Sequence, residues 1–478
     1  MKIDNPIFQR IWREQVYSPL ARLRCLIVVG VVLSSLTLSA FYDYRGPFIL
    51  AAIFIGIFTL SIIIVQPPLG IAALISVSLL LSFEIGTGTQ TNLNATVLLL
   101  PLLIGIWTIS FVLTPKKDSG ISSRPILAGI VFIIIVLFAF LRGFLLEYRG
   151  TNAPILTQIG QLAIFVFSIG AFLLGVFQVR SLKWLERIAW LFLCLGGVYI
   201  AARLVPAFGR LVIPLFPVGS TGSLFWMWLV VISFSQAFYN KGLSMRWRVV
   251  LLILCISTLY VSLSLGQSWA SGWLPSLIAV LAVLLVGSPK LGLFTTLGGI
   301  PLIVHQLSRI QEIILINEEY SAITRQAAWV SIVRLIRQDL FLGLGPANYY
   351  WYTASQPLMG WFVYFSSHNN YIDIIAQTGL LGFASFIWFI WEIARSGLRL
   401  LSKVPRGFVH AYVCGALGGL AGTLVAGLLG DWFLPFVYNI GLSGMRSSVL
   451  TWLFLGGLVG IPLMLRGPED NAKREMAK

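Results

Sequence analysis

One stretch of the sequence combines a histidine with polar neighbours and then enters an apolar run. It reads Ser366-Ser367-His368-Asn369-Asn370, and the apolar run that follows includes Gly379 and Gly382. A histidine is suited to moving a proton near neutral pH, because its unperturbed pKa is about 6.5. On a helix running on from His368, both glycines return close to the histidine's face, at about 3.6 residues per turn. The spacing therefore predicts an imidazole above a groove of small residues, against which another helix packs closely.

A second group of residues with chemical potential precedes this stretch. Arg325 and Trp329 are four residues apart, so on a helix they share one face. Gly343 and Gly345 form a Gly-x-Gly turn, and Tyr349 opens an aromatic run. Aromatic rings suit the apolar faces of sugars and also the interface of a membrane, so both interpretations of this run stay open.

The order of these residues resembles the motif of the O-antigen ligase and O-antigen polymerase superfamily of bacterial membrane glycosyltransferases. The resemblance covers residues 325–382 and is carried by Arg325, Trp329, Gly343, Gly345, His368, Asn369, Gly379 and Gly382. It implies inverting transfer of a glycan from a polyprenyl (undecaprenyl) diphosphate carrier to a hydroxyl of a glycan, lipid or protein acceptor. Ligation and polymerisation use the same donor chemistry, so both stay open.

The resemblance also implies roles for individual side chains. His368 is expected to be the catalytic base or to orient the acceptor. Arg325 is expected to neutralise the departing diphosphate, because a guanidinium stays charged and matches phosphate oxygens. Asn369, Trp329 and Tyr349 are expected to bind substrate. The structural motif consists of the glycines Gly343, Gly345, Gly379 and Gly382.

One part of the family pattern is missing. Many members carry a Ser-Arg pair at the outer end of an earlier helix, where this sequence has Ser268-Trp269. Another arginine must then supply the second phosphate contact. The outward-side arginines are Arg142, Arg149, Arg203 and Arg210. Of these we expect Arg210 or Arg203 to bind the substrate.

Neither a metal nor a cofactor is expected. The sequence contains no Asp-x-Asp pair and no glycine-rich nucleotide loop, so the clustered oxygen ligands that a hard cation requires are missing. The cysteines Cys25, Cys194, Cys255 and Cys414 lie within or at the ends of apolar runs and have no ligand spacing.

The composition excludes a soluble globular protein, because 58% of the residues are hydrophobic and only 10% are charged. The formal charge of +16 arises mainly from alternate loops, which hold 23 of the 33 lysines and arginines. This asymmetry predicts a multi-pass membrane protein with both termini in the cytoplasm, and the resemblance implies that the membrane is the bacterial inner membrane. Membrane lipids are then expected partners, and nucleic acid is not.

Apolar runs long enough for a bilayer core predict an all-α, polytopic membrane protein with about 12–14 transmembrane helices, and the resemblance implies that the fold is GT-C-like. The runs are 25–41, 48–65, 69–83, 95–113, 125–141, 155–177, 184–204, 221–239, 249–264, 271–287, 291–304, 369–391, 408–428 and 447–465. They divide the chain into a transmembrane bundle (1–304), a large extracytoplasmic loop with a helix (305–367), further transmembrane helices (368–465) and a cytoplasmic tail (466–478).

The alternative function is a flippase for lipid-linked glycans or another multi-pass transporter, which shares the helix count and the basic loops. Carriers of charged cargo usually keep ionisable residues in the middle of their spans. They often consist of two matching halves with broken helices, and no such internal symmetry is visible in this sequence. A cavity that opens outward and contains both His368 and Arg325 would favour the transferase.

Overall fold

The computed structural model describes residues 63–86, 92–113, 123–145, 152–216, 222–265, 269–305 and 323–465, together with Gly56 and Ser61. The run predicted at 25–41, most of 48–65 and the tail at 466–478 lie outside these residues. The chain divides into two compact units, Met1–Leu69 and Gly70–Lys478. The features that follow belong to the second unit, except that α4 begins at Pro67, at the end of the first unit.

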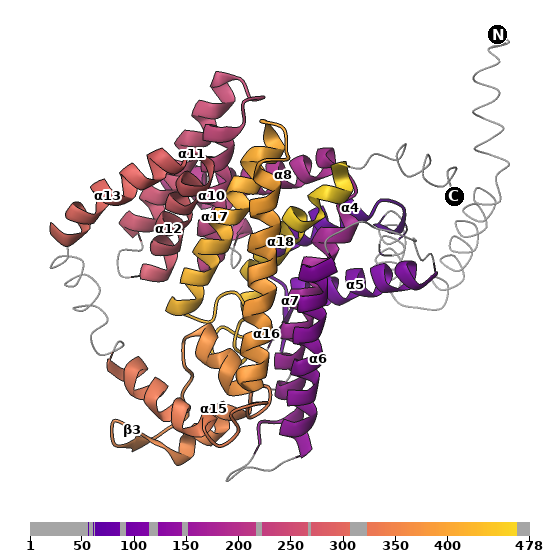
Figure 1. Cartoon of the computed structure of the whole chain (residues 1–478), viewed down its shortest axis with the longest axis vertical. Helices are drawn as coiled ribbons and strands as arrows, with labels where there is room; N and C mark the ends of the chain where they lie inside the picture. Colours follow the sequence, from indigo (N-terminus) through magenta and orange to yellow (C-terminus); the bar gives the residue numbers. More distant parts are fainter. Residues whose placement is uncertain are drawn as a thin grey trace. The chain divides into compact units, whose positions relative to one another are not determined.

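The second unit is built of helices (Figure 1). Their bounds are α4 (Pro67–Leu80), α5 (Ala95–Leu113), α6 (Ser123–Leu145), α7 (Ile155–Gln178), α8 (Leu182–Leu204), α9 (Pro206–Val212), α10 (Ser223–Tyr239), α11 (Met245–Leu265), α12 (Ala270–Gly287), α13 (Pro289–His305), α15 (Asn348–Tyr352), α16 (Asn370–Leu401), α17 (Phe408–Leu429) and α18 (Met445–Leu465). Another helix covers 323–336. Every apolar run predicted from 69–83 onward coincides with one of these helices.

Nine helices in the described part of the chain are long and apolar enough to cross a membrane. The predicted all-α, polytopic membrane fold is therefore confirmed. The helices differ in burial. In the span Leu442–Leu465, which contains α18, 83% of the apolar stretch is buried inside the protein, whereas in α5 only 22% is buried. Large apolar side chains such as Leu102 and Phe111 of α5 are exposed, as expected for a helix at the rim of a bundle that faces lipid.

Two short β-hairpins accompany the helices. Strand β1 (Glu84–Gly86) pairs antiparallel with β2 (Asn92–Asn94), and β3 (Pro357–Leu358) pairs with β4 (Trp361–Phe362). The first hairpin connects α4 to α5, where the amide of Asn94 donates 2.8 Å to the carbonyl oxygen of Leu442. This bond ties the first hairpin to the short 3-10 helix η4 (Leu442–Gly444) that precedes α18.

Helix α16 is broken in its middle, which the sequence did not predict. Gly379 has φ 66° and ψ −170°, a left-handed φ that residues with a side chain rarely adopt. The loop at 340–345 supplies backbone partners at the break: the amide of Leu381 donates 3.2 Å to the carbonyl oxygen of Phe341, and that of Leu344 donates 2.8 Å to Ala376. This loop therefore fills the gap in the helix.

The predicted glycine groove beneath the histidine is wrong. A Cβ on Gly343 would come 2.5 Å from the backbone nitrogen of Gly379, so both glycines are needed where the two backbones meet. His368 lies outside α16, which begins at Asn370, and its φ is 49°. The regular helix assumed from His368 onward does not exist, because the positive φ of His368 and the break at Gly379 both interrupt it.

Candidate functional site

The backbone just before His368 is held from three sides through Ser367. The indole Nε1 of Trp329 donates 2.7 Å to the Ser367 carbonyl oxygen. The Ser367 amide donates 3.3 Å to the hydroxyl of Tyr349, and its Oγ donates 2.6 Å to Oδ1 of Asp373. Ser367 is fully buried. These bonds hold His368 in its left-handed conformation, which is uncommon for a residue with a side chain.

Asn369 caps the start of α16. Its Oδ1 accepts from the amides of Tyr371 at 2.9 Å and Ile372 at 3.3 Å, and its Nδ2 donates 3.3 Å to the carbonyl oxygen of Leu428. An N-cap asparagine satisfies amides that have no partner within the helix. The side chain therefore positions His368 by fixing the first turn, and its contact with substrate stays a prediction.

Tyr349 is completely buried between the loop and α16. Its hydroxyl donates 2.5 Å to Oδ1 of Asp373, and its ring stacks on Phe436 with the centroids 4.8 Å apart. Burial raises the pKa of Tyr349 well above its usual range. These contacts suit a residue that holds Ser367 in place, and none of them places the ring against a ligand.

The imidazole of His368 belongs to a chain of three side chains that we call the Asp431–Asn439–His368 relay. Nδ2 of Asn439 lies 2.9 Å from Nδ1 of His368 and also donates to Oδ1 of Asp431. Asp431 is fully buried, and its Oδ2 accepts 2.6 Å from the amide of Phe436. Since an amide nitrogen only donates, Nδ1 of His368 is the proton-free nitrogen.

The segment that carries Asp431 and Asn439 is fixed to α16. The fully buried side chain of Asn370 donates 2.6 Å to the carbonyl oxygen of Leu434 and accepts 3.1 Å from the amide of Phe433. The sequence reasoning missed both relay partners. One signal was present, because Asp431 is the single acidic residue between Arg406 and Arg466.

The electrostatic surroundings keep His368 neutral. Burial and then the positive charge of Arg325 lower the pKa of His368 from its ordinary value. Burial raises the pKa of Asp431 to about 6. At pH 7 the relay therefore combines a neutral imidazole with an ionised carboxylate.

Arg325 lies on the helix at 323–336 close enough to His368 to lower its pKa. Trp329, one turn further along, makes the bond to Ser367. The structure thus brings Arg325, Trp329 and His368 together, whereas Arg334 on the same helix is exposed. The predicted shared face of Arg325 and Trp329 agrees with these positions.

The other two motif glycines also lie at close approaches. A Cβ on Gly345 would come 2.7 Å from the Cα of Gly143 in α6. A Cβ on Gly382 would meet the side chain of Thr378, one turn earlier in α16. Gly345, together with Gly343 and Gly379, positions the loop before the site, whereas Gly382 lies at a close contact within α16.

Arg203 and Arg210 are exposed at the end of α8 and in α9. The guanidinium of Arg203 lies 5.8 Å from the ring centroid of Tyr199, and Tyr199 packs at 5.6 Å against Phe225 near the start of α10. The residue before α10, Gly222, lies against Ser447 at the start of α18. Both arginines are therefore at the same end of the bundle as His368, and no contact between described residues joins them to it.

The remaining arginine candidates take other places. Arg142 forms an ion pair with Asp339 and so anchors the loop that enters α16. Arg149 lies outside the residues that the structure describes. Trp269, which stands where the family carries arginine, packs edge-on against Trp432 at 5.6 Å, directly beside Asp431.

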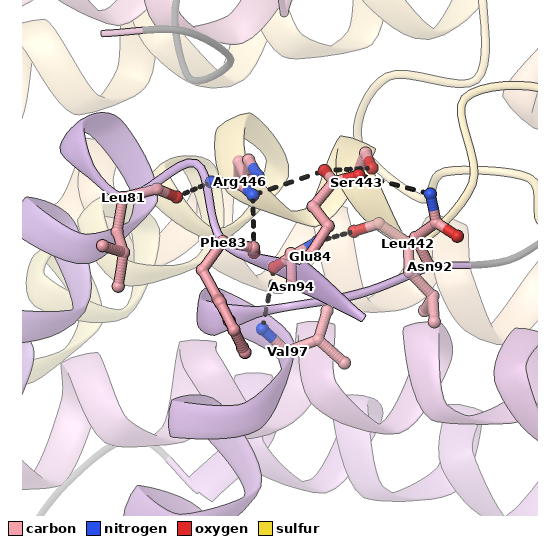
Figure 2. A network of polar contacts seen from close by, with 9 residues as sticks. All are labelled: Leu81, Phe83, Glu84, Asn92, Asn94, Val97, Leu442, Ser443 and Arg446. Atoms are coloured by element: carbon pink, nitrogen blue, oxygen red, sulfur yellow. Dashed lines mark hydrogen bonds and ion pairs between the residues drawn. The ribbon is translucent and has the colours of Figure 1, made fainter. Parts of the chain in front are cut away.

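A buried arginine that the sequence reasoning missed lies at the start of α18. Arg446 is 1% exposed, and its NH2 lies 3.3 Å from both the Glu84 carboxylate and the Phe83 carbonyl oxygen. The Glu84 carboxylate also accepts from Ser443 at 3.1 Å and from Asn92 at 3.3 Å. Figure 2 shows that this network joins the first hairpin to the start of α18.

A hollow of about 270 Å³ lies between β2 and the segment before α18. Its lining residues are Asn92, Val437, Tyr438, Asn439, Ile440, Gly441, Leu442 and Ser443. The central residue of the relay, Asn439, therefore also lines this hollow.

Metal ligands are not gathered in the described part of the chain, where no group of three or more His, Cys, Asp or Glu side chains is placed to hold an ion. The arrangement consists of a neutral imidazole, a nearby guanidinium and an adjoining hollow, which suits proton transfer beside an anionic group. A comparison with protein-family models and a comparison with curated proteins both find no match for this chain.

Proposed function

We propose that the protein is a membrane glycosyltransferase that moves a glycan from a polyprenyl diphosphate carrier to an acceptor hydroxyl. The observation that carries the proposal is the convergence of Arg325 and His368: Trp329, one turn after Arg325 on the same helix, donates 2.7 Å to the backbone before His368, and the charge of Arg325 lowers the pKa of the imidazole. The two residues are 43 positions apart in the sequence. The bond of Trp329 to the backbone before His368 keeps them together.

In the proposed reaction the acceptor hydroxyl attacks the anomeric carbon as the bond from this carbon to the diphosphate oxygen breaks. Nδ1 of His368 takes the hydroxyl proton, since it is the proton-free nitrogen of the ring. The leaving diphosphate departs with the bonding electrons, and Arg325 stabilises its growing negative charge. Attack from the opposite side inverts the anomeric configuration.

Asn439 has a defined part in this reaction. In the protein without substrate, the amide nitrogen of Asn439 donates a hydrogen bond to Nδ1 of His368. When the acceptor binds, its hydroxyl replaces Asn439 as the donor to Nδ1. Asp431 keeps the amide nitrogen of Asn439 turned toward the ring, which keeps Nδ1 free of a proton. Asp431 and Asn439 are positioning residues.

The position of the site supports a transferase over a transporter. His368, Asp431 and Asn439 lie outside the membrane-spanning helices, near their ends. A carrier of charged cargo usually keeps such groups at mid-span. We place this end of the bundle on the extracytoplasmic side of the bacterial inner membrane and both termini in the cytoplasm, in line with the distribution of basic residues.

The test is a transfer assay with purified protein in lipid nanodiscs and a synthetic polyprenyl diphosphate glycan. We expect His368→Ala and Arg325→Ala each to abolish transfer while membrane insertion and thermal stability persist. Arg334→Ala is the matched control, because Arg334 is exposed on the same helix and should leave the rate unchanged. Full activity of the His368→Ala protein would exclude the proposed role.

A further inference from the structure

The hollow beside Asn439 takes no part in the bonds that fix the backbone at Ser367. We propose that it binds an uncharged sugar unit of the acceptor and presents one hydroxyl to Nδ1 of His368. This inference rests on the proposed function for its catalytic meaning. The hollow itself is formed by Asn92 of β2 and by the segment 437–443.

The lining has the chemistry that recognises sugar hydroxyls. Asn92, Asn439 and Ser443 bring amide and hydroxyl groups, which donate and accept hydrogen bonds. Among the contacts of described residues, Oδ1 of Asn439 has no partner, because both neighbours of this amide are on its nitrogen. Tyr438 adds an aromatic ring suited to the apolar face of a sugar.

The charges around the hollow favour a neutral ligand over a phosphate. None of the described residues that line it is charged. The nearest arginine on the hairpin side, Arg446, is 1% exposed and is paired with Glu84, so it is not available to an anion. The Glu84 carboxylate, which bonds Asn92 and Ser443, would repel a phosphate.

The walls are held in place before a ligand arrives. Glu84 accepts hydrogen bonds from both sides of the hollow, from Asn92 at 3.3 Å and from Ser443 at 3.1 Å. The amide of Val437 donates 2.8 Å to Oε1 of Gln161 in α7. Because the walls are already ordered, less binding free energy is lost in ordering them, which favours recognition of a small ligand.

The position of Asn439 connects this hollow to catalysis. Its side chain lines the hollow and also bonds Nδ1 of His368 at 2.9 Å. A hydroxyl of a sugar in the hollow therefore reaches Nδ1 of His368 by displacing the amide of Asn439. The volume of about 270 Å³ is at the low end of ligand pockets, which are roughly 300–1,000 Å³, so it suits one sugar unit better than a chain of them.

The first test measures binding without chemistry. Saturation-transfer NMR on the purified protein would use the methyl glycosides of glucose, galactose, rhamnose and N-acetylglucosamine at millimolar concentration, with inorganic diphosphate as the anionic competitor. We expect at least one glycoside to bind the wild-type protein and diphosphate not to displace it. Asn92→Trp fills the hollow and should abolish the signal.

Milder and matched variants complete this test. Asn92→Ala and Ser443→Ala should each weaken binding by about tenfold, the usual scale for a lost hydrogen bond. Ile85→Trp is the control, because Ile85 is exposed on the same hairpin and does not line the hollow. It should bind the glycoside as the wild-type protein does, and both tryptophan variants should match the wild type in thermal stability.

The second test uses the transfer assay, in which Asn92→Ala should raise the KM for the acceptor about tenfold and leave the KM for the donor unchanged. The absence of glycoside binding to the wild type, equal binding by Asn92→Trp, or displacement by diphosphate would each overturn the inference. If binding is lost in Asn92→Trp but the wild type transfers no glycan, the sugar site stands and the proposed function fails. If the wild type transfers glycan and Asn92→Trp does so equally well, the proposed function stands and the sugar site fails.

Discussion

Asn439 donates through one amide nitrogen to Nδ1 of His368, at 2.9 Å, and to the buried carboxylate of Asp431. The two relay partners of the histidine come from one segment between α17 and α18, and Asn439 is 71 residues away from His368 in the sequence. The identity of the proton-free ring nitrogen therefore depends on a carboxylate that does not touch the ring. This dependence gives the site a characteristic response to pH.

The first prediction concerns that response. Because burial raises the pKa of Asp431 to about 6, its carboxylate is ionised above about pH 6 and protonated below. Asp373 is the second carboxylate that interacts with it, and Arg325 is the charge that faces His368. Protonated Asp431 can donate, so Asn439 is free to turn its oxygen toward the ring. The rate of transfer should therefore fall as the pH drops through about 6.

Measurement of kcat between about pH 5 and pH 8 checks this prediction. Asp431→Asn should lower kcat by about tenfold and remove the decrease in kcat that the wild type shows near pH 6. The decrease in rate that remains at low pH then comes from protonation of His368. Burial and the charge of Arg325 lower the pKa of His368 below its ordinary value. Identical acid limbs in the variant and the wild type would show that Asp431 does not control the ring.

The second prediction concerns the bond between Trp329 and the Ser367 carbonyl oxygen. Trp329→Phe keeps an aromatic ring but loses the 2.7 Å bond that fixes the backbone before His368. We expect kcat to fall about tenfold, because a buried carbonyl without its partner destabilises the active geometry by about 1–3 kcal/mol. Trp361→Phe is the control, since Trp361 is 74% exposed. Equal kcat values for the two variants would contradict the role of Trp329.

The third prediction concerns the break in α16. Gly379→Ala places a Cβ against the Phe341 carbonyl group in a backbone conformation that is nearly limited to glycine, which alone costs about 1–3 kcal/mol. We expect a clear decrease in the thermal unfolding temperature. Gly105→Ala in α5 is the control, because a Cβ there meets open space and alanine favours a helix. An unchanged unfolding temperature for Gly379→Ala would mean that the loop at 340–345 does not occupy the break.

The fourth prediction concerns the ion pair of Arg446 and Glu84. Arg446 is buried, whereas the Glu84 side chain is 29% exposed. Glu84→Ala removes the carboxylate partner of Arg446 and leaves it only the carbonyl oxygens of Leu81 and Phe83, which should cost about 1–3 kcal/mol. The double variant Glu84→Ala with Arg446→Met should recover part of this loss in a denaturation experiment. Additive losses would show that the two side chains do not interact.

The sequence predicted the helices well, because each transmembrane run carries its own apolar signal. It did not predict the break at Gly379, because its backbone partners come from the separate segment at 340–345. The spacing of apolar residues along a helix does not indicate which distant segment will supply hydrogen-bond partners to its backbone. Arg325, Trp329 and His368 do lie together, in agreement with the motif that suggested them.

The relay and the buried ion pair could not be predicted for the same reason. Asp431 and Asn439 reach His368 only after α16 and α17 have packed, and Arg446 meets Glu84 across more than half the chain. In the sequence each is a single polar residue beside an apolar run. The packing of distant segments, and not a local pattern, gives each of them its partner.

The proposed roles of Arg325 and His368 can be tested most directly with a structure of the protein with a polyprenyl diphosphate glycan bound. We expect diphosphate oxygens within hydrogen-bond distance of the Arg325 guanidinium, about 2.7–3.2 Å. We also expect His368 to lie beside the anomeric carbon, on the side opposite the leaving group. A diphosphate held by Arg203 or Arg210, with Arg325 and His368 away from the substrate, would contradict these roles.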